Sequence, residues 1–195
     1  VSGLTVDFIQ SLFFKIFGTN WFAYSLHSSA FNLVITISAY LFLIKINLEK
    51  YKAFLFSICL ATLSYTISGT PFVDLHATYF LLLATLIIMI NIKTNNQYLW
   101  AIATFLFFLS FFSKQVPASY AAVAYFFILL FYFIFNKYFK NILIIIASST
   151  VVVILIFIFL KLFDINFEDF YIQYFDYPLS IGQSRFIEIS FVDFF

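Results

Sequence analysis

A helix break is expected at residues 68–76, Ser68-Gly69-Thr70-Pro71-Phe72-Val73-Asp74-Leu75-His76, which separate two long apolar segments. Proline lacks a backbone donor and keeps the residue before it out of helical geometry, so a helix is expected to end here. Asp74 is the only acidic residue between Glu49 and Asp164. We expect Asp74 and His76 to meet water where the chain leaves a bilayer, in a loop from which both side chains can face one cavity.

The composition indicates an integral membrane protein. The chain has 195 residues, of which 64% are hydrophobic and 10% charged, whereas soluble domains average about 25% charged residues. Only helices and closed barrels satisfy their backbone in lipid, and the long apolar runs favour an all-α fold. A net charge of +1 argues against a nucleic-acid binder, which needs a basic face. The single Cys59 excludes an intrachain disulfide and a multi-cysteine metal site.

Six apolar segments of helical length predict a polytopic bundle over residues 21–160. The expected spans are roughly 21–44, 53–68, 77–92, 98–112, 118–135 and 141–160. We treat residues 1–195 as a single transmembrane domain. The chain begins at Val1 without an initiator methionine, so we expect it to be part of a longer protein.

Two flanking segments are expected to lie in the membrane interface. In residues 1–20, Asp7, Ser11 and Lys15 form a narrow polar stripe on an otherwise apolar helix over 4–17. That helix is too short to cross about 30 Å of hydrocarbon, and its amphipathicity suits the headgroup boundary. Residues 161–195 interleave acids with aromatics, and we expect this segment to be broken at Pro178 and Gly182.

The distribution of charge predicts the orientation. Loops 45–52, 93–97 and 136–140 carry six lysines, whereas the loops on the other side hold eight of the nine acids. Basic residues favour the cytoplasmic side. The loops that contain Asp74 and Lys114 are therefore expected outside, as in a multi-pass protein of a bacterial inner or plasma membrane.

Several side chains on that outer face are candidates for chemistry. Asp74 either caps the third helix or serves in acid–base or metal chemistry, which would require a second carboxylate. Lys114 and Gln115 either mark a helix end, where a lysine extends to the headgroups, or bind a phosphate. Arg185 either pairs with Glu188 or also binds phosphate. No Ser-His-Asp set and no Gly-rich phosphate loop is present in the sequence.

The first span carries a polar stripe that includes Asn32, with His27 at its edge. In lipid such side chains turn inward to bond neighbouring helices. The alternative is that His27 or Asn32 contacts a ligand.

Three stretches resemble the GT-C membrane glycosyltransferases, the superfamily of the protein mannosyltransferases and aminoarabinose transferases. Residues 12–27, Leu-Phe-Phe-Lys-Ile-Phe-Gly-Thr-Asn-Trp-Phe-Ala-Tyr-Ser-Leu-His, are similar to the segment that leads from the first periplasmic loop into the next helix. Residues 108–117, Phe-Leu-Ser-Phe-Phe-Ser-Lys-Gln-Val-Pro, are similar to a recurring helix end with a Thr/Ser-Lys pair. Residues 69–76 resemble an acidic position of the second outer loop.

The resemblance implies inverting transfer of a sugar from a polyprenyl-phosphate donor, on the periplasmic side, to an acceptor that the sequence does not identify. The partners implied are membrane lipid and the polyprenyl-phosphate-linked sugar. The family's catalytic acid would lie upstream of Val1. Asp74 would match a secondary acidic position and Lys114 a contact to the donor phosphate. No cofactor is required with certainty, and a divalent metal, with Asp74 as candidate ligand, is an option.

Two alternatives to sugar transfer remain. A transporter or flippase-like bundle would carry ionisable residues near mid-membrane and paired broken helices. No Asp, Glu, Lys or Arg falls deep within a predicted span, which counts against this alternative. The other alternative is a structural membrane subunit without catalysis.

Overall fold

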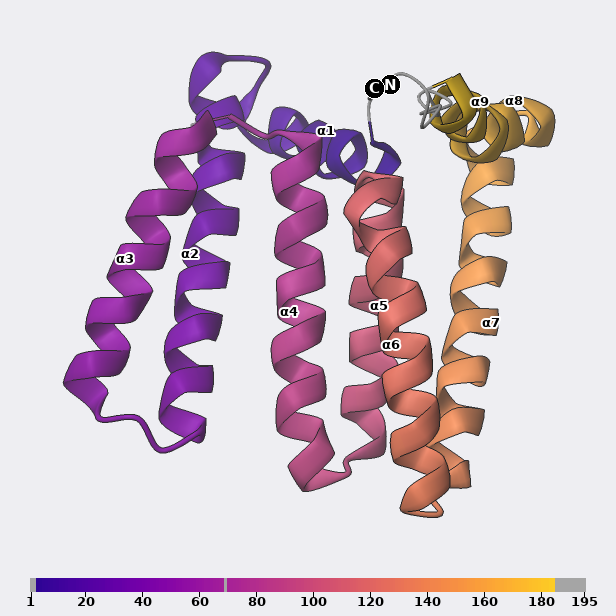
Figure 1. Cartoon of the computed structure of the whole chain (residues 1–195). Coiled ribbons are helices and arrows are strands. Elements are labelled where there is room, and N and C mark those ends of the chain that lie inside the picture. The colour runs from indigo at the N-terminus through magenta and orange to yellow at the C-terminus, as the bar shows by residue number, and fades with distance from the viewer. Residues whose placement is uncertain (1–2, 69, 185–195) are drawn as a thin grey trace, which may run out of the picture. The chain divides into compact units, whose positions relative to one another are not determined.

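The computed structural model describes residues 3–68 and 70–184, and this part of the chain contains helices and no strands. It divides into two compact units, one ending at Val152 and the other beginning at Val153. The helices that belong wholly or partly to the first unit are α1 (Leu4–Phe17), α2 (Trp21–Lys45), α3 (Lys50–Ser68), α4 (Val73–Thr94), α5 (Gln97–Ser113), α6 (Gln115–Phe135) and α7 (Phe139–Leu162) (Figure 1). The prediction of an all-helical fold is confirmed for the described residues.

Short polar turns end the helices close to the expected residues. The side-chain oxygen of Asn20 accepts a hydrogen bond from the Ala23 N–H at 2.9 Å and caps α2. Asn95 ends α4 in the left-handed region, with φ 48°, which asparagine adopts more readily than most residues. The largest shift of a boundary is at α4, which begins at Val73 and not at Ala77.

Four helices within the described residues are long and apolar enough to cross a membrane, namely α2, α4, α6 and α7. α5 is apolar but has 17 residues, and α3 is not among the four. These helices support a membrane protein. The count of six crossings stays a prediction.

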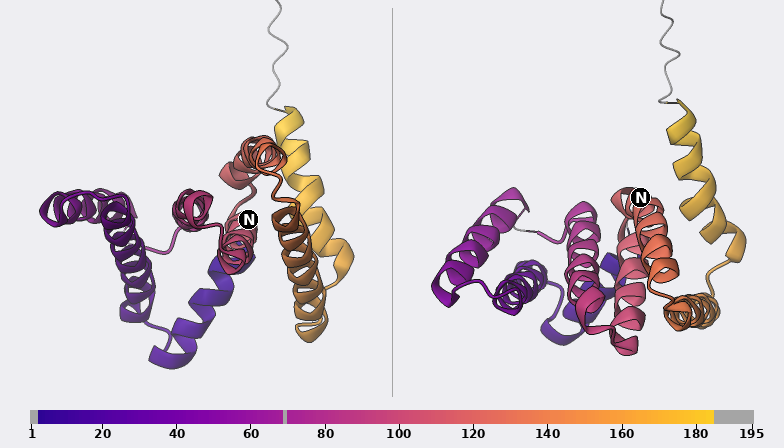
Figure 2. Two further views of the ribbon diagram at one scale, coloured as in Figure 1. Left: turned by 90° about the horizontal axis from the view of Figure 1, so that it is seen from below. Right: turned by 60° about the horizontal axis from the view of Figure 1, so that its bottom comes forward.

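Consecutive helices from α2 to α6 run in alternating directions (Figure 1), and α2 packs against both α3 and α4. Figure 2 shows α4 between the α2–α3 pair and α5. Side-chain hydrogen bonds join neighbouring helices. Asn32 Nδ2, for example, donates to the Ala61 carbonyl at 3.1 Å, and the buried Ser110 Oγ donates to the Ala77 carbonyl at 2.7 Å. Asn32 therefore bonds the neighbouring helix α3, as expected of a bundle-facing polar stripe.

Asn91 organises the turn between α4 and α5. Its side chain is fully buried. Its Nδ2 donates to the Asn96 carbonyl at 2.9 Å, and its Oδ1 accepts from the Asn96 N–H at 2.7 Å and from Thr94 Oγ1 at 3.1 Å. One amide side chain thus satisfies both backbone groups of Asn96.

Replacing Asn91 by leucine is expected to lower the free energy of unfolding by about 1–3 kcal/mol, because it removes three hydrogen bonds that hold the turn, each worth about 0.5–1.5 kcal/mol. Denaturant titration of the detergent-solubilised protein, followed by tryptophan fluorescence, measures this change. The exposed Asn136 at the α6–α7 turn provides the control. The free energy of unfolding of Asn136→Leu should stay within about 0.5 kcal/mol of the wild-type value. Equal losses for the two variants would contradict the role of Asn91.

In the second unit, the remainder of α7 is followed by α8 (Phe167–Tyr171), the π-helical turn η1 (Ile172–Asp176) and α9 (Tyr177–Ser184). The rings of Phe157 and Phe167 stack with centroids 5.7 Å apart. The predicted break at Pro178 is wrong, because Pro178 is the second residue of α9. Proline clashes with the carbonyl four residues earlier in an α-helix, and the wider π-helical turn before Pro178 relaxes that clash.

The helix also continues through Gly182, where a second break was expected. The candidate phosphate ligand Arg185 lies outside the described residues.

Candidate functional site

Asp74 and His76 lie in the first turn of α4 and not in a loop. Residues two apart on a helix point toward different faces. The expectation that both side chains face one cavity from a loop is therefore wrong, because the helix starts at Val73. The N-cap residue is Phe72, which makes no side-chain capping hydrogen bond. Asp74 sits near the positive end of the helix dipole, where a carboxylate is favourable.

Asp74 forms an ion pair with Lys114, forty residues away in the sequence. Lys114 has an extended backbone between α5 and α6 and serves as the C-cap of one helix and the N-cap of the other. The side chains of Asp74 and Lys114 are 40% and 42% exposed. The pair is thus held at the end of the bundle, where a ligand can reach it.

His76 meets His27 of α2 on another side of the α4 helix. The two Nε2 atoms are 3.2 Å apart, and both side chains are almost completely buried. Phe13 of α1 stacks on the His27 ring with centroids 4.9 Å apart, and Phe31 lies 4.4 Å from the His76 ring. The two imidazoles are therefore enclosed by aromatic side chains.

The outer nitrogens of the two rings are also engaged. His76 Nδ1 lies 3.0 Å from the Phe72 carbonyl, and His27 Nδ1 lies 2.8 Å from Gln10 Oε1 of α1. A carbonyl oxygen only accepts, so His76 Nδ1 donates to it, and in a neutral ring His76 Nε2 then accepts from His27 Nε2. That assignment leaves His27 Nδ1 as an acceptor that faces the Gln10 amide.

Gln10 completes the chain of hydrogen bonds in one of two ways. Its Nε2 is buried without a hydrogen-bond partner, and turning the amide over would let Nε2 donate to His27 Nδ1. Alternatively, one proton added to the histidine pair lets both Nδ1 atoms donate to the oxygens they face. In either arrangement, the orientation of the Gln10 amide is coupled to the protons that the histidine pair holds.

α1 is fixed to the same end of the bundle by a close approach of backbone to backbone. A Cβ atom added to Gly3 would lie 2.0 Å from the carbonyl oxygen of Ser113, the last residue of α5. From that contact α1 crosses this end of the bundle toward α2 (Figure 1). Side chains of α1, α2, α4 and the α5–α6 junction thus converge at one end of the first unit.

The structure places the candidates from the sequence in two groups. Asp74 pairs with Lys114, beside which Gln115 starts α6, and His76 pairs with His27. The role of Gln10 was missed. One feature of the sequence could have indicated this role. Gln10 is a polar residue that does not belong to the exposed polar stripe of α1, and an amide on the packing face of an amphipathic helix needs a buried partner.

Metal binding was a further option at Asp74. Within residues 3–68 and 70–184, no group of three or more His, Cys, Asp or Glu side chains is arranged to hold a metal ion. The described partner of the Asp74 carboxylate is Lys114.

Comparison with models of known protein families, with curated proteins and with solved structures gave no match for this chain.

Proposed function

We propose that this chain is the membrane part of a GT-C-like glycosyltransferase, which transfers a sugar from a polyprenyl-phosphate donor on the extracytoplasmic face. In this proposal α2–α7 cross the membrane, and the donor phosphate binds at Lys114 and Gln115. The observation that carries the proposal is the half-exposed Asp74–Lys114 pair at the end of the bundle. Together with residues 12–27 and 108–117, which resemble that superfamily, the pair favours a phosphate-linked lipid as ligand.

The charges at the two ends of the first unit support this orientation. One end carries Lys45, Lys50, Lys52, Lys93, Lys137 and Lys140 against the single acid Glu49. The other end, formed by α1, the start of α4 and the α5–α6 junction, carries two lysines and two aspartates. Lysine-rich ends favour the cytoplasm, so the Asp74–Lys114 end would face outward.

The faces of α1 support a position in the membrane interface. Thr5, Val6 and Gln10 are buried against the bundle. The exposed surface has a polar stripe, Asp7, Ser11 and Lys15, beside an apolar stripe, Phe8, Leu12 and Ile16. A helix that offers adjacent polar and apolar stripes can contact headgroups and acyl chains at once. In this position α1 would form part of the surface along which a lipid-linked substrate approaches the Asp74–Lys114 pair.

Lys114 is suited to a phosphate because its present ion pair is exchangeable. Ion pairs between partly exposed side chains stabilise a protein by only about 0–1 kcal/mol. A phosphate offers several acceptor oxygens to an ammonium group and would compete with Asp74 for it. Displaced from Lys114, the Asp74 carboxylate would become available to the acceptor. The resemblance assigns the catalytic acid to a segment upstream of Val1, and Asp74 would have a secondary role.

Binding of polyprenyl phosphate to the purified chain in nanodiscs tests the proposal, with the phosphate-free polyprenol as comparison. We expect tighter binding of the phosphate form and a loss of about tenfold or more in Lys114→Met, because a hydrogen bond to a charged group contributes about 1.5–3 kcal/mol. Lys45→Met, at the opposite end of the bundle, is the matched control. Equal binding of the two lipids, or equal losses in the two variants, would rule out a phosphate site at Lys114.

A second candidate function is favoured by the histidine pair. His27 and His76 are buried ionisable side chains within helices of membrane-spanning length, and such residues often mark a transport pathway. Lipid flipping or solute uptake in proteoliposomes that is abolished by Asp74→Asn, without any sugar transfer, would support a transporter instead.

A further inference from the structure

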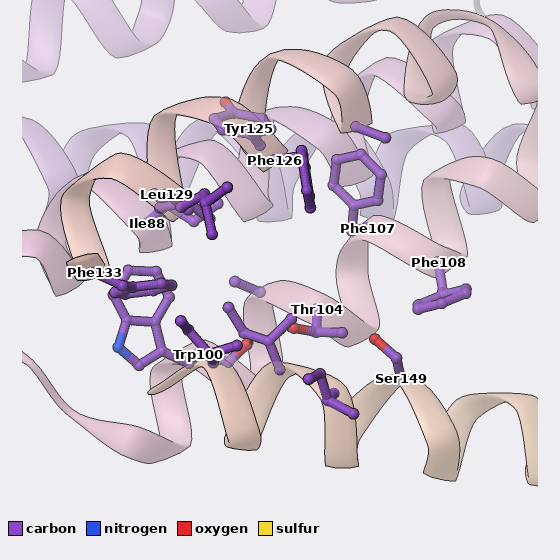
Figure 3. Close-up of a pocket in the computed structure, with 16 residues that line it drawn as sticks. Ile88, Trp100, Thr104, Phe107, Phe108, Tyr125, Phe126, Leu129, Phe133 and Ser149 are labelled. Atoms are coloured by element: carbon purple, nitrogen blue, oxygen red, sulfur yellow. Dashed lines mark hydrogen bonds between the residues drawn. The ribbon is translucent and has the colours of Figure 1, made fainter. Parts of the chain in front are cut away.

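An apolar cavity lies among α5, α6 and α7, with Ile88 of α4 in its wall. Its volume is about 360 Å³, within the range of about 300–1,000 Å³ typical of ligand pockets. Trp100 and Phe133 lie at one end of the cavity and Phe108 at the other (Figure 3). Nearly all the lining side chains are aliphatic or aromatic, so the cavity offers little to hold water.

The cavity communicates with the surroundings of the helices. Two of its lining side chains, Phe126 of α6 and Ile146 of α7, are 61% and 56% exposed. Both helices are long and apolar enough to span a membrane. The medium that faces such an opening is lipid hydrocarbon, and an acyl chain fits an apolar cavity at that depth.

Two lysines lie within four residues, along the chain, of lining residues at the end of the cavity marked by Trp100 and Phe133. Lys137 follows Phe133 by four residues, in the turn between α6 and α7, and Lys140 precedes the lining residue Ile142 by two. Both lysines are exposed and neither has an acidic neighbour in this loop. Trp100 itself is buried and packs against Phe133, with the ring centroids 5.0 Å apart.

We propose that this cavity binds one hydrocarbon chain of an anionic phospholipid, whose phosphate lies at Lys137 and Lys140. Basic side chains at the mouth of a groove between membrane helices are suited to anionic headgroups of the cytoplasmic leaflet. The site is at the opposite end of the first unit from Asp74 and Lys114, and it does not depend on sugar transfer. The proposed site thus joins an apolar chain site to a cationic phosphate site in one leaflet.

The test measures lipid retained by the purified chain, by native mass spectrometry, after equilibration with nanodiscs of equimolar phosphatidylglycerol and phosphatidylcholine. We expect phosphatidylglycerol to be retained preferentially. Substituting glutamine for both Lys137 and Lys140 should reduce that retention about twenty-five-fold, at about fivefold for each lysine near the headgroups. The control pair Lys45→Gln and Lys50→Gln lies at the same end of the bundle but on α2 and α3 and should leave retention unchanged.

The chain site is tested separately by filling the cavity. Ala122→Phe, and independently Ser149→Phe, place a ring among the lining residues and should displace the retained lipid. Ala124→Phe adds the same ring at an exposed position of α6 outside the cavity and is the matched control. Monodisperse elution and unchanged helical circular dichroism establish that each variant is folded. Equal retention of the two lipids, or retention unaffected by both cavity-filling variants, would overturn the proposal.

Discussion

Replacing Gly3 by valine is expected to detach the start of α1 from the bundle. The added Cβ atom would lie 2.0 Å from the Ser113 carbonyl oxygen and 2.8 Å from its carbonyl carbon. Backbone atoms at the end of α5 cannot move aside as a flexible side chain can. Overpacking of this kind costs about 1–3 kcal/mol, occasionally more, and movement of the start of α1 away from Ser113 relieves it.

The consequence should extend to the histidine pair, because Gln10 and Phe13 reach His27 from α1. Hydrogen exchange of the purified protein should show faster exchange for the amides of α1 and unchanged exchange in α4 and α5. Ser11→Val, on the exposed face of the same helix, is the control and should leave the exchange of α1 unchanged. Wild-type exchange in Gly3→Val would mean that α1 is not held by its contact with Ser113.

Replacing His27 by leucine is expected to destabilise the bundle by about 2 kcal/mol or more. The substitution leaves His76 Nε2 and the Gln10 amide buried without their described partner, and each unsatisfied buried group costs about 1–3 kcal/mol. Leucine is of similar size and apolar and leaves little empty space. The loss of stability therefore measures mainly the missing hydrogen bonds. Denaturant titration in detergent measures the change.

A double-mutant cycle separates the hydrogen-bond network from general disruption. Gln10→Leu should destabilise the wild-type protein but have a smaller effect in the His27→Leu background, where the amide has already lost its partner. His27→Gln, which keeps a donor and an acceptor, should lose less stability than His27→Leu. Strictly additive effects of the two leucine substitutions would be inconsistent with a hydrogen bond between Gln10 and His27.

The positions of the helices followed from local features of the sequence. The helix over residues 4–17 was predicted with the bounds that α1 has, and Asn95 with Asn96 marks a turn that the structure retains. An apolar run and the residues that interrupt it extend over only a few helical turns, and helical hydrogen bonds are equally local. The break expected at Pro178 failed because a π-helical turn accommodated the proline, and composition gave no sign of that turn.

The candidate site was predicted only in part. The sequence identified Asp74, His76 and Lys114 as chemically informative, and it placed Asp74 and Lys114 at the same end of the predicted bundle. It could not pair Asp74 with Lys114, because that contact depends on how α4 and the α5–α6 junction are rotated toward each other. The partnership of His27 with His76, separated by 49 positions, depends on the same rotation of α2 and α4.

By itself, the sequence determined that this chain forms apolar helices and where most of them begin and end, because helix formation depends on neighbouring residues and on apolar length. Tertiary structure decided which face of each helix meets which neighbour. It brought Gln10, His27 and Lys114 to Asp74 and His76 from three other parts of the chain. Those contacts join residues far apart in sequence, so they arise from packing between helices and not from any local pattern.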